Sequence, residues 1–257
     1  MSQPCIFCDN SAGNREHLWP QWILDRKSFG SFRMKLPGAP EVILNNTELT
    51  VKSVCEKCNN GWMSALEGDA KPLLEQMFDD KPLALDLHRQ RIIATWITKM
   101  AFLFDSTKGR NATNVFYEKS EGTAFKEHLL IPQFTLIWIG RLSEEHRSAD
   151  GADFTLLSEE DRIGEGTSLT LANEHFVAQI AGVRLKVTPT IPTELNIEPK
   201  PGNWNNQLIQ IWPPENTVVH WPPPIPVTNG GPDGYFYLMD RWRQGDEVTK
   251  ITKDSIR

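Results

Sequence analysis

The chain has 257 residues, of which 39% are hydrophobic and 23% are charged, a composition typical of a soluble globular protein. Its formal net charge of −6 at pH 7 argues against a protein that holds nucleic acid by a general electrostatic field, so a polyanion would need a local basic surface. No apolar run approaches the length that spans a bilayer, and the N-terminus lacks the basic and apolar regions of a signal peptide, so we expect a cytoplasmic protein with no membrane partner.

All four cysteines stand in two CxxC pairs, Cys5 with Cys8 and Cys55 with Cys58. In the reducing cytoplasm such pairs bind metal more often than they form disulfides. Four thiolates predict one tetrahedral Zn²⁺, which is structural because no coordination position stays open. The alternative is two redox-active CxxC pairs, but these would require a βαβ pattern around them, which the sequence lacks.

Residues 1–67 are rich in turn formers and have too little apolar periodicity to fold without a metal. Val51–Val54 has strand character and leads into the second cysteine pair, and Trp62–Glu67 predicts the first turns of a helix. We call the two CxxC pairs the first knuckle (residues 5–8) and the second knuckle (residues 55–58). The order first knuckle, loop, strand, second knuckle and helix is that of a treble-clef zinc finger.

Three polar residues beside the cysteine pairs could carry chemistry. Glu16 and His17 follow the first pair, and Asn59 directly follows Cys58. Phosphodiester hydrolysis needs a base to activate water and a cation to stabilise the pentacovalent phosphate, and a His beside a carboxylate can supply both functions. Asn59 could be the N-cap of the following helix, a second ligand of that cation with Glu16, or both.

Basic and aromatic side chains near these motifs allow two interpretations each. The tryptophans Trp19, Trp22 and Trp62 either pack around the finger, which we favour because small zinc modules lack core material, or stack on a base. Two basic groups either form a local surface for a polyanion or are ordinary solvated charge: Arg26, Lys27, Arg33 and Lys35, and His88, Arg89 and Arg91.

Residues 68–130 are predicted to be helical. From Pro72 to about Phe104 the pattern is helical. Between Ile92 and Phe104 the apolar residues recur with helical spacing, which predicts a broad apolar stripe on a long amphipathic core helix. Trp96 and Met100 lie on this stripe, so we expect them to pack and not to bind a ligand.

Beyond residue 130 the pattern becomes β. Apolar and β-branched runs predict an antiparallel sheet or small sandwich with these strands: Phe134–Ile139, Phe176–Ile180, Val183–Val187, Leu208–Ile211 and Val218–Trp221. Ala181 and Gly182 could turn a hairpin between two of them, and long polar loops are predicted at 143–166 and 189–206. Prolines follow Trp212 and Trp221, where they would stop ladder pairing.

The predicted fold class is therefore α+β, with three units. Residues 1–67 form the zinc module, residues 68–130 a helical segment, and residues 131–257 an antiparallel β-rich domain. The last unit is a candidate for substrate selection or for binding a protein partner or activator.

The motifs of the first unit resemble the zinc-stapled branch of the HNH endonuclease superfamily, whose fold is the ββα-metal form of the treble clef. The likeness covers about the first 67 residues and rests on the cysteine spacing, on Glu16-His17-Leu18-Trp19-Pro20, and on Asn59 after the last cysteine. It implies His17 as general base and Glu16 and Asn59 as ligands of a catalytic Mg²⁺ or Mn²⁺. It also implies nucleic acid as substrate, DNA in preference to RNA, with 5′-phosphate and 3′-hydroxyl products.

One position departs from the family pattern, because Thr50 stands where the family has its middle Asn. Asn45 or Asn46 could substitute through a different loop path, or the Thr50 hydroxyl could orient His17. Two other functions stay open at this stage: a non-catalytic zinc-finger adaptor for nucleic acid or protein, and a nuclease that is silent until engaged, as a defence or toxin effector would need to be.

Overall fold

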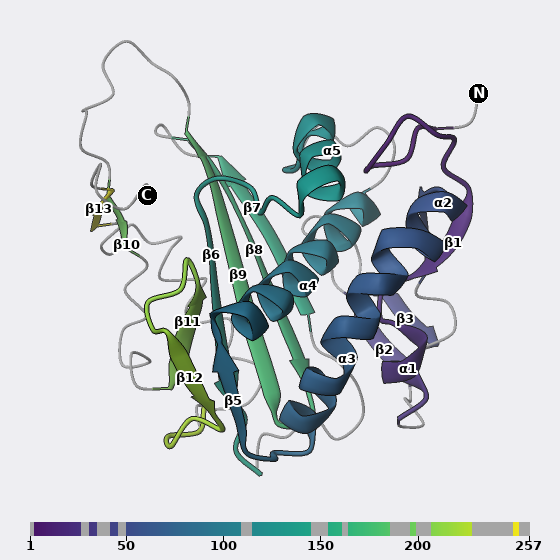
Figure 1. Cartoon of the computed structure of the whole chain (residues 1–257). Helices are drawn as coiled ribbons and strands as arrows, with labels where there is room; N and C mark the ends of the chain where they lie inside the picture. The colour runs from purple at the N-terminus through teal and green to yellow at the C-terminus, as the bar shows by residue number, and fades with distance from the viewer. Residues whose placement is uncertain are drawn as a thin grey trace.

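The computed structural model describes residues 3–26, 31–34, 42–45, 50–108, 115–144, 154–160, 164–185, 196–198, 207–227 and 249–251. It is a mixed α and β fold in which the helices α3 (Ser64–Phe78) and α4 (Leu87–Asp105) pack beside each other and α4 crosses one face of an antiparallel sheet (Figure 1). The predicted α+β class is confirmed at this level. Lys27, Lys35 and Asn46 lie outside the described residues.

The N-terminal part begins with the strand β1 (Asn14–His17), which pairs antiparallel with β4 (Thr50–Val54). Between them lie one helical turn and a second strand pair, α1 (Gln21–Leu24), β2 (Ser31–Met34) and β3 (Val42–Asn45). After β4 the chain enters α2 (Glu56–Cys58), the wide helical turn η2 (Asn59–Met63) and then α3. The strand predicted at 51–54 and the helix beginning at 62–67 are thus present.

The long helix predicted to carry the stripe from Ile92 to Phe104 is present as α4. The helical pattern from Pro72 onward is not continuous, because the strand β5 (Leu83–Asp86) separates α3 from α4. Helix α3 ends at Phe78, and Asp80 has a left-handed backbone conformation with a φ of 57°. Asp86 then begins α4 as its N-cap, accepting the backbone N–H of Arg89 at 2.8 Å. An Asp-rich break followed by an Asp N-cap is a helix stop and start signal.

Helix α4 is the centre of the core. Every residue from Ile93 to Asp105 is buried, so the helix is covered on all sides and not only along the predicted stripe. Trp96 and Met100 are fully buried, which confirms their packing role. At its C-terminal end the turn η3 (Ser106–Lys108) follows, and Asp105 accepts the backbone N–H groups of Phe116 and Tyr117 at 2.8 and 2.9 Å.

The main sheet has five strands in the order β11-β6-β9-β8-β7, every pair antiparallel. Its members are β6 (Thr135–Arg141), β7 (Phe154–Glu160), β8 (Gly164–Asn173), β9 (Phe176–Leu185) and β11 (Leu208–Trp212). The helix α5 (Lys119–His128) precedes β6.

Three details of the predicted β region are wrong. Strand β9 runs without a break through Ala181 and Gly182, and the hairpin turn lies instead at Glu174, whose φ is 50°. The stretch 143–166 contains β7 and the start of β8, and 189–206 contains β10 (Asn196–Glu198), which pairs with β13 (Thr249–Ile251). The Gly, Ser and Thr residues of these strands carry little apolar signal, so pairing with neighbouring strands decides their conformation.

Strand β12 (Val218–Trp221) does not join the main sheet but pairs with β5, which brings the C-terminal region against the helical segment. The chain does leave β11 and β12 at Trp212-Pro213 and Trp221-Pro222, as the prolines predict.

One cluster of buried side chains runs from Cys5 to Trp221 and crosses both predicted boundaries, after residues 67 and 130. A smaller cluster that includes Trp138 and Val177 packs on the other face of the sheet, because neighbouring residues of a strand point to opposite faces. The division into three units, 1–67, 68–130 and 131–257, stays a prediction. No helix among the described residues is long and apolar enough to cross a membrane.

Candidate metal centre and adjoining polar cluster

The four cysteines converge on one point. Their sulfur atoms all lie within 4.8 Å of one another, and Cys8 Sγ is 3.5 Å from the sulfurs of both Cys55 and Cys58. A zinc ion about 2.3 Å from four sulfurs implies sulfur–sulfur edges of about 3.8 Å. The donor set therefore fits a tetrahedral zinc ion held by four thiolates.

Backbone N–H groups of both knuckles point at sulfur. Phe7 N donates to Cys5 Sγ at 3.4 Å, and Cys58 N donates to Cys55 Sγ at 3.4 Å. The side chain of Asn10 approaches Cys55 Sγ at 3.8 Å. These donors favour thiolates. Burial raises the pKa of Cys55, but the hydrogen bonds to its sulfur, of which the bond from the Cys58 N–H is the strongest, outweigh burial and lower the pKa to about 7.

The thiols of Cys5 and Cys58 resist ionisation in the protein alone. Burial raises the pKa of Cys5 and of Cys58, and the Cys8 thiol raises that of Cys58 further. Four adjacent buried thiolates would also repel one another. A bound cation is what makes this arrangement of sulfurs favourable.

Helix α5 closes tightly over the first knuckle. Lys119 donates through Nζ to the carbonyl oxygens of Cys5 and Cys8. Gly122 lies so close to Ile6 that a Cβ added to the glycine would stand 2.2 Å from the Ile6 carbonyl oxygen. Position 122 therefore needs a glycine for close approach.

Between the first two cysteines, the fully buried Phe7 enters an aromatic cluster. Its ring centroid lies 4.9 Å from that of Trp62, 5.5 Å from Phe102 and 6.3 Å from Phe125. The knuckle is thereby packed into the main core by aromatic side chains from η2, α4 and α5.

All three tryptophans of the finger pack against the core, as the sequence favoured. Trp19 is 1% exposed and lies 6.4 Å from both Trp96 and Phe104, and Trp22 stacks on Phe78 at 6.0 Å.

The residues predicted to do chemistry lie on the β1–β4 pair and on the turn after the second knuckle. In the register of the pair, Glu16 faces Val51 and His17 faces Thr50. Glu16 is only 8% exposed, whereas His17 and Thr50 are half-buried. Glu16 is thus the more deeply buried of the two residues, and His17 and Thr50 form a half-buried cross-strand pair.

Glu16 and Asn59 are brought together. Burial raises the pKa of Glu16, and a hydrogen bond that the side chain of Asn59 donates to the Glu16 carboxylate opposes this rise. Asn59 is not a helix N-cap, because its backbone is helical and its N–H donates to Cys55 O at 3.0 Å; the N-cap of this turn is Cys55. The N-cap interpretation of Asn59 is therefore wrong, and its side chain is available for polar contacts.

Two more charges belong to this cluster. Lys99 of α4 is 0% exposed and forms an ion pair with Glu67 of α3. Burial raises the pKa of Glu16 to about 7; the charge of Lys99 lowers it and that of Glu67 raises it. Near neutral pH the buried carboxyl of Glu16 is thus close to half-protonated, a state that a bound cation would shift toward the carboxylate.

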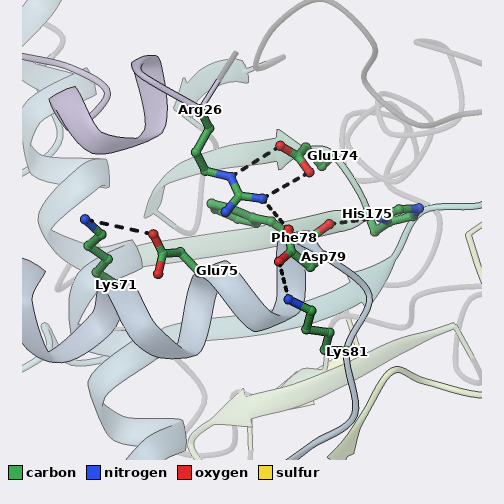
Figure 2. A network of polar contacts seen from close by, with 8 residues as sticks. All are labelled: Arg26, Lys71, Glu75, Phe78, Asp79, Lys81, Glu174 and His175. Atoms are coloured by element: carbon green, nitrogen blue, oxygen red, sulfur yellow. Dashed lines mark hydrogen bonds and ion pairs between the residues drawn. The ribbon is translucent and has the colours of Figure 1, made fainter.

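Of the first basic group, the structure describes the side chain of Arg26, and carboxylates already occupy its guanidinium, so the basic surface stays a prediction. Figure 2 shows Arg26 between Asp79 and Glu174, and its Nε lies 3.4 Å from the Glu174 carboxylate. The Arg26 guanidinium also lies 5.6 Å above the Phe78 ring. In contrast His88, Arg89 and Arg91 are exposed at the start of α4.

Sequence reasoning missed Glu67, Lys99, Lys119 and Gly122. The one available signal was a lysine within the otherwise uncharged stretch from Ile92 to Phe104. Within the described ranges, no second group of three His, Cys, Asp or Glu side chains brings its ligand atoms together as the cysteines do. No protein family, curated protein or solved structure matches this chain.

Proposed function

We propose that the chain is a metal-dependent endonuclease of the HNH type, which hydrolyses phosphodiester bonds of nucleic acid. The observation that supports this proposal most is the contact between Glu16 on β1 and Asn59 on the turn after the second knuckle. These two side chains are the ones that the family resemblance assigns to the catalytic cation. The β1–β4 pair followed by a helix, with a cysteine cluster beside it, also agrees with a ββα-metal module of the treble-clef type.

In this proposal Glu16 and Asn59 hold the cation, and their carboxylate and amide oxygens are the hard donors that Mg²⁺ and Mn²⁺ prefer. A bound divalent cation would stabilise the negative charge that develops on the phosphate and the leaving oxygen. His17, half-buried at the end of β1, takes the proton of the attacking water. The quartet of Cys5, Cys8, Cys55 and Cys58 fixes β1 against the turn that carries Asn59.

Thr50 takes the position of the residue that orients His17. It is the cross-strand partner of His17, so its hydroxyl is the nearest candidate for that task within this pair of strands. Asn45 belongs to β3, where its partner is Ser31. The proposal therefore assigns the orienting role to Thr50 in preference to Asn45.

A cleavage assay tests the nuclease directly. Plasmid DNA, single-stranded DNA and RNA are incubated with zinc-loaded protein and Mg²⁺ or Mn²⁺, comparing wild type with His17→Ala. The matched control is His128→Ala, since His128 lies on the exposed end of α5. We expect metal-dependent cutting, DNA before RNA, that His17→Ala lowers at least about 100-fold and the control leaves unchanged. Folded, zinc-loaded protein that cuts none of these substrates would refute the proposal.

The same assay examines Thr50 and the alternative functions. Thr50→Ala should lower the rate and Thr50→Asn should keep or raise it, because an amide can also hold an imidazole by a hydrogen bond. The burial of Glu16 at 8% exposure favours the second candidate, a non-catalytic zinc adaptor, since it restricts access to the carboxylate. Binding of nucleic acid or protein without any cutting would favour that adaptor. Cutting that appears only after a partner is added would favour a regulated effector controlled through residues 131–257.

A further inference from the structure

The turn between β8 and β9 consists of two residues, Glu174 and His175, because Asn173 pairs directly with Phe176. Such short turns usually contain Gly or Asn, since they require left-handed backbone conformations. Here Glu174 has a φ of 50°, and the two residues are only 6% and 7% exposed. A strained turn with two buried titratable side chains indicates that the contacts of these side chains decide which residues stand here.

The two side chains of the turn bind different parts of the chain. Glu174 accepts the Arg26 guanidinium, whose Nε and Nη2 each lie 3.4 Å from one of its carboxylate oxygens (Figure 2). His175 contacts the last residue of α3, because its Nδ1 lies 2.9 Å from the Phe78 carbonyl oxygen. Asp79, which follows Phe78, pairs with Arg26 as well. The turn thus joins the sheet to the end of α3 and to the segment after α1.

The second ring nitrogen of His175 also faces an oxygen acceptor. Its Nε2 lies 2.9 Å from a carboxylate oxygen of Glu144, whose side chain is 69% exposed. A carbonyl oxygen can only accept, so Nδ1 must carry a hydrogen, and a carboxylate at Nε2 requires a second one. Exposed glutamic acids are ionised at neutral pH, so this second hydrogen belongs to the ring. The geometry therefore fits the imidazolium form of His175, with both nitrogens as donors.

We propose that the β8–β9 turn is a proton-sensitive latch, which holds the sheet to the end of α3 and to the segment after α1 and weakens when His175 loses one of its two ring hydrogens. Arg, Lys, Asp and Glu ordinarily keep their charge near neutral pH, whereas His ordinarily changes its charge there. His175 is therefore the member of this network that responds to pH in that range. The charged groups around the turn are Arg26 after α1, Asp79, Asp80 and Lys81 after α3, Arg141 and Glu144 in and after β6, and Glu174 in the turn itself.

Loss of the second hydrogen to solvent changes the contact of His175 with Glu144. The lone pair of Nε2 then faces a carboxylate, and two acceptors repel each other. The ring keeps one hydrogen bond, to Phe78, and the strained turn loses one of the contacts that hold it in place. The turn and its partner Arg26 should therefore separate more often as the pH rises.

The latch gives the sheet a hold on the chain segment that runs from His17 through α1 to Arg26. His17 is the general base in the proposed function, so an open latch would loosen the segment next to it. The inference itself does not rest on that function, because the latch needs neither a catalytic cation nor a substrate.

Hydrogen–deuterium exchange of the full, zinc-loaded chain tests the latch. Opening of the peptides that cover the β8–β9 turn and α1 is measured from about pH 6 to about pH 8.5 and corrected for the intrinsic pH dependence of amide exchange. Wild type should open about tenfold more often at the higher pH, because a hydrogen bond to a charged group is lost. His175→Gln, which has no imidazole, should not show this increase.

Glu144→Gln is the sharper variant, because it leaves the histidine in place at an exposed contact. An amide can accept a hydrogen from Nε2 or donate one to it, so the contact survives at either pH and opening should change less than about twofold. The control is His128→Gln, since His128 belongs to a second pair of His and Glu, with Glu127, and is 73% exposed on α5. This control should keep the pH dependence of wild type.

Three results would overturn the inference. They are wild-type opening that does not rise with pH, a rise that persists in Glu144→Gln, and a neutral His175 ring at about pH 6 in nitrogen NMR spectra of the folded protein. Circular dichroism checks the fold, and should His175→Gln fail to fold, Glu144→Gln alone decides. None of these measurements involves cleavage, so a failed latch and a failed nuclease are recognised separately.

Discussion

The close approach of α5 to the first knuckle predicts that Gly122→Ala is destabilising although alanine is the better helix former. The added Cβ would stand 2.2 Å from the Ile6 carbonyl oxygen and 3.3 Å from its carbon, with the Phe102 ring at 3.7 Å. The obstacle is backbone, so α5 must retreat by about 1 Å to reach ordinary contact. Overpacking of this kind costs about 1–3 kcal/mol, and the helix propensity of alanine returns at most about 1 kcal/mol.

The chain offers a matched control. Gly68 lies on the exposed side of α3, and a Cβ there meets nothing within 4 Å. Gly68→Ala should therefore raise the free energy of unfolding by about 0.5–1 kcal/mol, whereas Gly122→Ala should lower it by about 1–2 kcal/mol.

Urea unfolding measures both effects, and transfer of zinc to a coloured chelator measures the knuckle separately. A shifted α5 also disturbs the Lys119 bonds to the Cys5 and Cys8 carbonyls, so zinc should leave Gly122→Ala several-fold faster than wild type. The reasoning is refuted if both glycine variants are equally stable and release zinc at the same rate.

Two further predictions follow from the cysteine cluster and from Arg26. The protein should bind about one zinc ion per chain, measured by mass spectrometry, and Cys58→Ser or treatment with a strong chelator should remove it. Loss of the zinc should lower the midpoint temperature of thermal unfolding. Chelated protein that unfolds at the same temperature as the zinc-loaded form would contradict a structural metal. Arg26→Ala should destabilise the fold by about 1–3 kcal/mol in urea, because it removes the cationic partner of Glu174, which is 7% exposed. The control is Lys81→Ala, because Lys81 also pairs with Asp79 but its side chain is 64% exposed, and this substitution should cost under about 1 kcal/mol. Equal losses of stability in Arg26→Ala and Lys81→Ala would refute the prediction.

The spacing of the cysteines was the strongest information in the sequence, and it predicted the cluster of four sulfur atoms that the structure brings within 4.8 Å of one another. Short CxxC knuckles constrain their own backbone locally, so little of this depended on the rest of the fold. The roles of Glu16 and Asn59 come from the resemblance and stay a prediction, and the pairing of His17 with Thr50 depends on a strand register that the sequence did not indicate.

The errors occur where long-range contacts decide the structure. The break between α3 and α4 has a local signal in Asp79, Asp80 and Asp86, but β5 exists because β12 pairs with it from far along the chain. Strand β9 continues through Gly182 because β6 and β8 hold it on both sides. Lys99 could not be assigned a role from periodicity, because its partner Glu67 lies on another helix.

The position of Phe7 has a consequence for the order in which the chain assembles. Phe7 is made first, and its ring partners Phe102 and Phe125 emerge from the ribosome only after most of the helical segment has been synthesised. Until then Trp62 is the one of the three ring partners that is available to Phe7, and contacts of long sequence separation form slowly and leave apolar surface open to aggregation. Early binding of zinc by Cys5 and Cys8 cannot complete the site, because Cys55 and Cys58 are synthesised later. The first knuckle therefore reaches its final structure only after these later residues have been made.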